Sequence, residues 1–262
     1  MSDAALARAV SGPDHPLTVL EVALQAARAG AAVVALADRP RSARAKEARG
    51  DVVTDIDVAA ERAITSELAR TRPGDRVIGE ESGVNESDAP TLEWYVDPID
   101  GTTNFLLGLP HYAVSVAAYS PVLAHWIAGV VITPALRITY GAARGYGAWA
   151  ETDEGRQALS ACCAPGAPRI LATGLSYDAD LRATQVEDLS RALHGFDDVR
   201  ALGSAALALC AVAAGHVDSY VESDLYVYDW AAGALIAEEA GATVVRPPLT
   251  RGGISAQVRR SG

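Results

Sequence analysis

Acidic residues gather in four short segments of the chain, and their chemistry suggests a metal site. The segments are Asp51–Asp57, Gly79–Glu81, Asp97–Thr103 and Tyr228–Trp230. Hard cations such as Mg²⁺ prefer carboxylate and carbonyl oxygens as ligands. Two such ions held by bridging carboxylates can clamp both the attacking and the leaving oxygen of a phosphoryl transfer.

The segment Asp97–Thr103 is the most informative of the four. Asp97 ends a strand-like and otherwise apolar run, where a carboxylate has no packing role. A proline stiffens the backbone between Asp97 and Asp100, and a glycine and two threonines follow. Backbone N–H groups at such a turn can bind an anionic oxygen, especially where a helix begins. Carboxylates and an anion-binding turn within seven residues indicate a combined metal and phosphate site.

Each of the other segments also has an ordinary structural interpretation. Asp51–Asp57 could be a turn or a helix cap, and Glu80–Glu81 could be a solvated turn. Asp229 precedes an alanine-rich run and could be a helix N-cap. Taken alone, none of these three segments identifies a metal site.

Asp97–Phe105, which reads Asp-Pro-Ile-Asp-Gly-Thr-Thr-Asn-Phe, resembles the signature of the inositol monophosphatase family. Gly79–Glu81 precedes it at suitable spacing, Asp229–Gly241 resembles the second family signature, and Lys46–Asp57 resembles the segment upstream of the glutamate pair. The resemblance runs from about residue 17 to residue 246. It implies an α+β fold, a layered α-β-α-β-α sandwich of the inositol monophosphatase and fructose-1,6-bisphosphatase type, and a homodimer.

The resemblance also implies a role for individual residues. Two or three Mg²⁺ ions would be held by Glu80, Asp97, the Ile99 carbonyl, Asp100 and Asp229, with Asp97 bridging two ions. Glu80 and Thr102 would orient the attacking water, with Asp51 supporting Thr102. The substrate would contact Asp100, Gly101, Thr102 and Thr103 through its phosphate, and Gly203, Ser204, Ala205, Glu222 and Asp229 through its hydroxylated part.

We therefore expect a magnesium-dependent, lithium-sensitive phosphatase that hydrolyses a small phosphate monoester, with inositol 1-phosphate as the first candidate. Thr103–Asn104 favours this branch, because histidinol-phosphate and nucleotide-directed relatives more often carry Lys at position 103. Histidinol phosphate and fructose 1,6-bisphosphate stay open as alternative substrates. A different class of function is a regulatory binding partner of transcription or ribosome assembly, although intact carboxylates in all four segments argue against a purely non-catalytic role.

Composition bounds the remaining possibilities. The chain has 33 acidic and 22 basic residues and a net charge of −11, with no basic stripe, so nucleic-acid binding is not expected. No apolar run approaches the ~20 residues that span a bilayer, and Met1–Val10 lacks the apolar stretch of a secretory signal. We expect a cytoplasmic protein without a membrane segment. The three cysteines show no zinc-ligand spacing, and Cys210 is interpreted as core.

Periodicity predicts helices and strands throughout the chain. Helices are expected over 17–34, 57–70, 181–193, 204–214 and 230–240, and strands over 76–79, 94–96, 112–119, 127–132, 169–172, 197–200, 217–222 and 243–246. We expect one compact unit with halves 1–150 and 151–262 and a polar boundary over 151–168. The segment after Val245 lacks the family's usual final apolar run, so the resemblance does not predict the last strand and helix. Ala208 and Tyr228 also depart from the family pattern, which commonly has Asp and Trp there.

Overall fold

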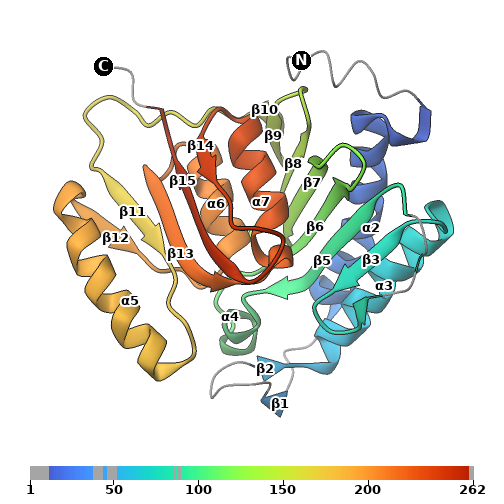
Figure 1. Cartoon of the computed structure of the whole chain (residues 1–262), viewed down its shortest axis with the longest axis horizontal. Helices are drawn as coiled ribbons and strands as arrows, with labels where there is room; N and C mark the ends of the chain where they lie inside the picture. Colours follow the sequence, from blue (N-terminus) through green and yellow to red (C-terminus); the bar gives the residue numbers. More distant parts are fainter. Residues whose placement is uncertain (1–11, 38–43, 46–51, 85–86, 88–89, 260–262) are drawn as a thin grey trace.

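The described part of the chain folds as two large β-sheets and three layers of helices that alternate in space, α-β-α-β-α, with β1 (Arg44–Ala45) and β2 (Val52–Val53) as a separate two-stranded sheet (Figure 1). This computed structural model describes residues 12–37, 44–45, 52–84, 87 and 90–259. The fold class is therefore the α+β sandwich that the sequence predicts. Both Lys46 and Asp51 lie outside the described residues.

The helices and strands have the following bounds. The helical elements are η1 (Gly12–Asp14), α2 (Pro16–Leu36), α3 (Asp55–Thr71), α4 (Thr102–Leu107), α5 (Ala179–Ala192), η2 (Leu193–Gly195), α6 (Ala205–Ala213) and α7 (Val227–Glu239). The strands are β1 (Arg44–Ala45), β2 (Val52–Val53), β3 (Arg76–Gly79), β4 (Gly83–Val84), β5 (Glu93–Asp100), β6 (Ala113–Ser120), β7 (His125–Thr133), β8 (Ile138–Ala143), β9 (Ala148–Thr152), β10 (Gly155–Ala158), β11 (Ile170–Thr173), β12 (Asp198–Arg200), β13 (Ser219–Leu225), β14 (Thr243–Val245) and β15 (Gly252–Gln257).

Helices α2 and α3 form one outer layer. The apolar side of α2 contains Val19, Ala23, Leu24, Ala27 and Ala31, which are buried against α3 and the first sheet. Among the described helices, α2 is long and apolar enough to cross a membrane, which the sequence had not led us to expect. In this structure it packs as a core helix, because its buried residues fall on one stripe at helical spacing.

The first sheet carries the site at its centre. Within the described residues its strand order is β10-β9-β8-β7-β6-β5-β3-β4. β5 lies between β6, which is antiparallel to it, and β3, which is parallel. Helices cover both faces, so six of the eight residues of β5 are buried. The last residues of β5 are thus enclosed on both sides.

Helices α6 and α7 form the middle layer. Residues of α7 are buried between the two sheets, together with apolar residues of α6, β13 and β15. Cys210 of α6 is fully buried, as interpreted from the sequence. The middle layer therefore brings the N-termini of α6 and α7 towards the end of β5 from the other half of the chain.

The second sheet has the strand order β12-β11-β13-β15-β14, and α5 lies on its outer side (Figure 1). Two details differ from the expectations. The predicted boundary over 151–168 contains β10 and the end of β9, so the first sheet extends to Ala158. The final strand, which the resemblance did not predict, is present as β15 and pairs with β13 and β14.

Candidate active site

The end of β5 holds two of the predicted ligands on an irregular stretch of strand. The pairing between β5 and β6 shifts register between Asp97 and Asp100. Asp97 is 2% exposed, and its Oδ1 accepts a hydrogen bond from the Ile99 N–H at 3.0 Å. The two aspartates on either side of this shift lie close enough for the charge of Asp100 to raise the pKa of Asp97.

Four carboxylates crowd together at this point, and their charges raise the pKa of Asp97 and of Asp229. The pKa of Asp97 is held well above its usual range, first by burial and then by the charges of Glu80, Asp100 and Asp229. Burial also raises the pKa of Asp229 well above its usual range, with Glu80 and Asp100 adding to the effect. The structure therefore brings together side chains that are separated by up to 149 positions in sequence (229 − 80).

Asp100 reaches across to the first turn of α6. Its Oδ2 accepts from the Ser204 hydroxyl at 2.6 Å and from the Ala206 N–H at 2.7 Å, and its Oδ1 from the Ala205 N–H at 3.3 Å. Burial raises the pKa of Asp100 to about 6, and these hydrogen bonds oppose the rise. The expected substrate residues Gly203–Ala205 thus lie beside the acidic cluster.

The turn that follows Asp100 requires glycine and is tied to the same loop. Gly101 has φ +98°, and a Cβ there would lie 2.9 Å from the His111 carbonyl oxygen. Asn104 donates through Nδ2 to the carbonyls of His111 and Leu202, each at 2.7 Å. The amide therefore joins α4 to residue 202 and fixes Thr102 and Thr103 next to Gly203.

The carboxylate that contacts Thr102 belongs to Asp57. The Thr102 hydroxyl lies 3.0 Å from Asp57 Oδ1 and 3.0 Å from the Ile99 carbonyl oxygen. Asp57 is buried. It also forms the capping box of α3 with Thr54, because its Oδ2 accepts from the Thr54 N–H at 2.9 Å and from the Thr54 hydroxyl. The sequence interpretation assigned this support to Asp51, which lies outside the described residues.

Glu80 follows β3, and a second buried carboxylate fixes the turn in which it lies. Glu61 of α3 is 2% exposed, and it accepts from the N–H groups of Glu81 at 2.8 Å and Ser82 at 2.7 Å. A Cβ at Gly79 would lie 2.6 Å from this carboxylate, so the approach needs glycine. Sequence reasoning missed Glu61, whose only signal was an acidic residue on the inner face of α3.

Asp229 lies in the first turn of α7. Its Oδ2 accepts from the Tyr226 N–H at 2.7 Å. Tyr226 is the N-cap of α7 and Asp229 is the third residue of the helix, so the interpretation of Asp229 as the N-cap is wrong, and its carboxylate caps the helix from within the first turn. The cap fixes the rotamer of Asp229, while α7 brings it to the cluster.

Glu222 stands on β13 of the second sheet. Burial raises its pKa to about 7, with smaller contributions from Asp100 and Asp224, and the Tyr220 hydroxyl opposes the rise by donating at 2.7 Å. Tyr220 is fully buried and was not predicted as a site residue. Glu222 is thus the one expected substrate contact that the second sheet supplies.

The cluster offers the donor types that Mg²⁺ prefers, carboxylates and a backbone carbonyl. Among the described residues, no three His, Cys, Asp or Glu side chains are arranged as ready-made ligands around one metal ion. The oxygens are instead directed at protein donors, such as Ser204 for Asp100 and Tyr226 for Asp229. The repulsion that raises the pKa of Asp97 is what a divalent cation would relieve, so these residues fit such an ion.

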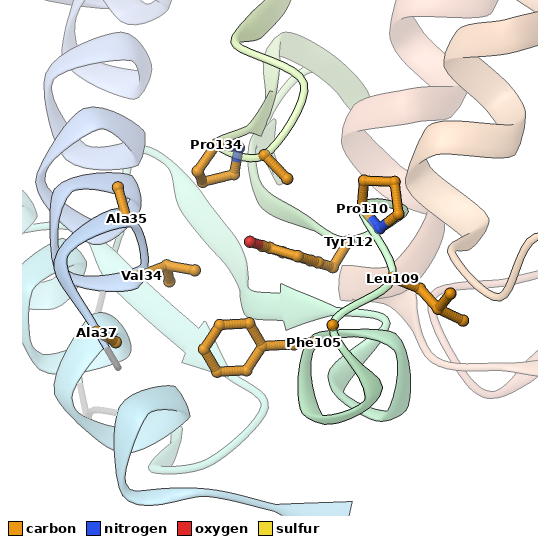
Figure 2. Close-up of a pocket in the computed structure, with 10 residues that line it drawn as sticks. Val34, Ala35, Ala37, Phe105, Leu109, Pro110, Tyr112 and Pro134 are labelled. Carbon is orange, nitrogen blue, oxygen red and sulfur yellow. The ribbon is translucent and has the colours of Figure 1, made fainter. Parts of the chain in front are cut away.

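A separate apolar pocket lies on the other side of α4. Figure 2 shows the rings of Phe105 and Tyr112 facing a cavity of about 290 Å³ between α4 and the end of α2. The two rings meet edge to face with centroids 5.1 Å apart. The lining residues carry no carboxylate, so this pocket is separate from the acidic cluster.

Fold and site together define a class of proteins: five-layered α+β sandwiches with a buried acidic cluster beside a Gly-Thr-Thr turn. The sequence model of the inositol monophosphatase family matches residues 15–255, and the chain belongs to this family. Family membership supports a phosphatase.

Three comparisons illustrate the relationship. The chain is 42% identical over 221 residues to the inositol-1-monophosphatase SuhB of Mycobacterium tuberculosis (strain ATCC 25618 / H37Rv), covering 82% of this chain and 76% of the relative. It is 36% identical over 233 residues to the Nus factor SuhB of Escherichia coli (strain K12), covering 88% and 85%. The solved structure of Mycobacterium tuberculosis SuhB superposes with a TM-score of 0.76 at 38% identity, covering 93% of this chain and 91% of that one.

Proposed function

We propose that this protein is a magnesium-dependent phosphatase that hydrolyses inositol 1-phosphate to inositol and phosphate. The observation that carries the proposal is the meeting of Asp97, Asp100 and Asp229 with Glu80 beside the Gly101–Thr103 turn. Family membership and the names of the mycobacterial relatives support it further.

In this proposal Glu80, Asp97, the Ile99 carbonyl, Asp100 and Asp229 hold two or three Mg²⁺ ions. When bound, the ions would lower the pKa of water and neutralise charge on the phosphate. The chain's own part is to keep the carboxylates close together in a largely buried place, where their mutual repulsion favours cation binding.

Thr102 and Glu80 orient the attacking water. A threonine hydroxyl has one proton and two lone pairs. When the Thr102 hydroxyl donates to Asp57, a lone pair is free to accept a hydrogen bond from water. Asp57 therefore acts as a positioning residue, in the role that the sequence resemblance had given to Asp51.

The phosphate binds at the Asp100–Thr103 turn, where the first N–H groups of α4 have no acceptor within their own helix. The hydroxylated part binds towards Gly203–Ala205, Glu222 and Asp229. In this proposal the substrate would lie between the two sheets, because α4 follows β5 of the first sheet while Glu222 lies on β13 of the second.

Inositol 1-phosphate is proposed over other esters because Thr103–Asn104 follows the Asp-Gly-Thr turn. Asn104 is engaged with two backbone carbonyls, so in this proposal the side chain at position 103 is the one that discriminates between substrates. Histidinol phosphate and fructose 1,6-bisphosphate are the alternatives. The Escherichia coli relative is named a Nus factor, which keeps a regulatory partnership as the alternative of a different class.

The test is phosphate release from a panel of four esters: inositol 1-phosphate, histidinol phosphate, fructose 1,6-bisphosphate and 3′-phosphoadenosine 5′-phosphate. Each is assayed with Mg²⁺, with chelator, and with Mg²⁺ plus Li⁺. The proposal predicts Mg²⁺-dependent and Li⁺-inhibited turnover with the highest kcat/KM for inositol 1-phosphate. A higher kcat/KM for another ester would overturn the substrate assignment. Folded protein that releases no phosphate from any of them would overturn the reaction and favour the regulatory alternative.

A further inference from the structure

Three segments that are far apart in sequence meet beside Glu222. They are the loop between β11 and α5 (residues 174–178), the irregular end of β13 (222–225) and the loop between β14 and β15 (246–251). Asp224 connects them: its Oδ2 accepts from the Ser176 hydroxyl at 2.8 Å, and its carboxylate pairs with Arg251. We call Ser176, Asp224 and Arg251 the Asp224 clamp.

Arg251 makes a two-pronged contact with this carboxylate. Its Nε lies 2.6 Å from Oδ1 and its Nη2 lies 2.9 Å from Oδ2 of Asp224. Its Nη1 donates to the Tyr226 hydroxyl at 3.0 Å, and the guanidinium lies 4.7 Å from the centre of the Tyr226 ring. A planar guanidinium suits this geometry and a lysine ammonium does not. The contact fixes the 246–251 loop against the end of β13.

The backbone at Asp224 needs such support. Asp224 has φ +74°, a conformation that costs energy in any residue with a Cβ. It lies in the register shift of β13, between Glu222 and Leu225. The clamp therefore holds a strained bulge only two residues from a proposed substrate contact.

The position of Glu222 depends on two of the clamped segments. Its carboxylate lies against Gly174, where a Cβ would come within 2.1 Å of Glu222 Oε2. Gln185 of α5 ties the same segments again, because it accepts from the Ser176 N–H at 2.7 Å and donates to the Ser223 hydroxyl at 2.9 Å. Glu222 thus lies between the 174–178 loop and the end of β13, and the hydrogen bonds of Asp224 and Gln185 join these two segments.

We propose that Asp224 and Arg251 are positioning residues that aim Glu222 at the hydroxylated part of the substrate. This inference rests on the proposed function and deepens it, because it names what fixes the sugar-alcohol side of the site. The contacts of Asp224 and Arg251 described above surround the end of β13 that carries Glu222, so we expect the clamp to act on substrate recognition more than on the chemical step.

The test uses two variants of the clamp and one control. Asp224→Gly removes the carboxylate and leaves a residue that adopts positive φ without cost, and Arg251→Met removes the guanidinium while keeping most of the apolar stem. The control is Arg246→Met, which breaks another two-pronged pair at the start of the same loop, with Arg246 Nη1 and Nη2 at 2.6 and 3.0 Å from the Glu238 carboxylate of α7. KM and kcat are measured for inositol 1-phosphate and for 4-nitrophenyl phosphate, which has no ring hydroxyls, and thermal unfolding is recorded for each protein.

For both clamp variants we expect KM for inositol 1-phosphate to rise about tenfold while kcat changes by less than about twofold. KM for 4-nitrophenyl phosphate should stay unchanged, and Arg246→Met should change neither KM even where it lowers the unfolding temperature. The inference is overturned if both substrates are affected equally, if neither is affected, or if Arg246→Met gives the same selective rise.

The proposed function and this inference fail in different ways. If the wild-type protein prefers another hydroxylated ester, only the substrate assignment fails. KM and kcat of the clamp variants are then compared between that ester and 4-nitrophenyl phosphate. If the wild type turns over no ester, the proposed function fails and the inference fails with it. If Asp224→Gly does not fold, Arg251→Met decides the matter, and Arg251→Lys should recover only part of the affinity.

Discussion

The Thr102 hydroxyl is held by a carboxylate that lies 45 positions earlier in the chain. Asp57 serves two purposes, because one oxygen caps α3 through Thr54 and the other meets Thr102. Burial raises the pKa of Asp57, while the hydrogen bonds from Thr54 and Thr102 oppose the rise. Three donors around one carboxylate make the ionised form the best hydrogen-bond acceptor here.

Asp57→Asn should lower kcat about 10- to 100-fold with little change in KM, since the amide cannot accept from both Thr102 and Thr54. Steady-state kinetics on the best substrate of the panel measures this. Asp55→Asn is the matched control, because it removes a carboxylate from the exposed side of the same helical turn. Equal kcat in the two variants would show that Asp57 does not position Thr102.

Site residues could be predicted where they are neighbours along the chain. The residues of Asp97–Thr103 are neighbours in both sequence and space, so a single motif indicated their role. Choosing among Asp51, Asp55 and Asp57 needed the start of α3, because the hydrogen bonds at Thr54 decide which carboxylate turns inward. Glu61 and Tyr220 act through side chains or turns elsewhere, and no spacing in the sequence marked them.

At the scale of elements, the long helices and most strands were predicted, including the short strands β3, β12 and β14, while α4, β8 and β9 were missed. α2 and α3 are 21 and 17 residues long, and each shows a clear apolar stripe. α4 has only six residues, too few for a helical period. β8 and β9 were also missed, because Ile138–Ala143 and Ala148–Thr152 mix strand-forming residues such as Tyr140 and Trp149 with glycine and alanine, so neither shows a continuous strand pattern.

β15 shows how tertiary contacts determine a strand that the sequence does not indicate. Its sequence, Gly-Gly-Ile-Ser-Ala-Gln, has little strand propensity. It forms because it completes the sheet between β13 and β14 and buries Ile254 and Ala256 in the core. The loop that leads into β15 carries Arg251, so the same strand brings the Asp224 clamp to the site.

At the scale of the whole molecule, two halves of the chain each contribute carboxylates to one enclosed place. Asp97 and Asp100 come from the first sheet, Asp229 from the middle layer and Glu222 from the second sheet. The repulsion among them is a cost of folding that bound cations would remove. The protein's net charge of −11 adds to this effect.

The stability of the chelated protein should therefore fall as the pH rises. The folded-state pKa values of Asp100 and Glu222 are raised to about 6 and about 7. The stabilisation of the folded state by these protonated carboxyl groups is therefore complete below the unfolded-state pKa values near 4, and it is lost as the pH rises through 6 to 7. For Asp100 the rise from 3.8 to about 6 corresponds to at most about 3 kcal/mol, or several degrees in unfolding temperature. Mg²⁺ should stabilise the protein more at pH 8 than at pH 5.5.

Thermal unfolding with chelator and with Mg²⁺ at the two pH values measures this. Asp100→Asn is the matched variant, because it keeps an acceptor and removes one titrating group. With chelator, the wild type should lose stability relative to Asp100→Asn as the pH rises. Two results would show that the cluster does not carry the predicted charge repulsion. One is a rise in unfolding temperature with Mg²⁺ that is the same at both pH values. The other is an unfolding temperature of the chelated wild type that increases relative to Asp100→Asn at pH 8.

Dimer formation and a cytoplasmic location remain predictions from the resemblance and the composition. Size-exclusion chromatography with light scattering tests the first, and the expected result is twice the 27.2 kDa mass of the chain. A monomer at assay concentration would contradict the family expectation.

The most direct test of the central claim is Mg²⁺-dependent phosphate release by Asp97→Asn beside the wild type. The variant differs by one charge at the centre of the cluster, and Asp75→Asn, which alters a buried carboxylate bonded to Trp94 and Arg72, is the control. If Asp97 holds the cations, the variant should fold and lose at least about 10³-fold in kcat/KM at every Mg²⁺ concentration, while Asp75→Asn stays within about threefold of the wild type. Near-normal Mg²⁺-dependent turnover by Asp97→Asn would contradict the proposed site.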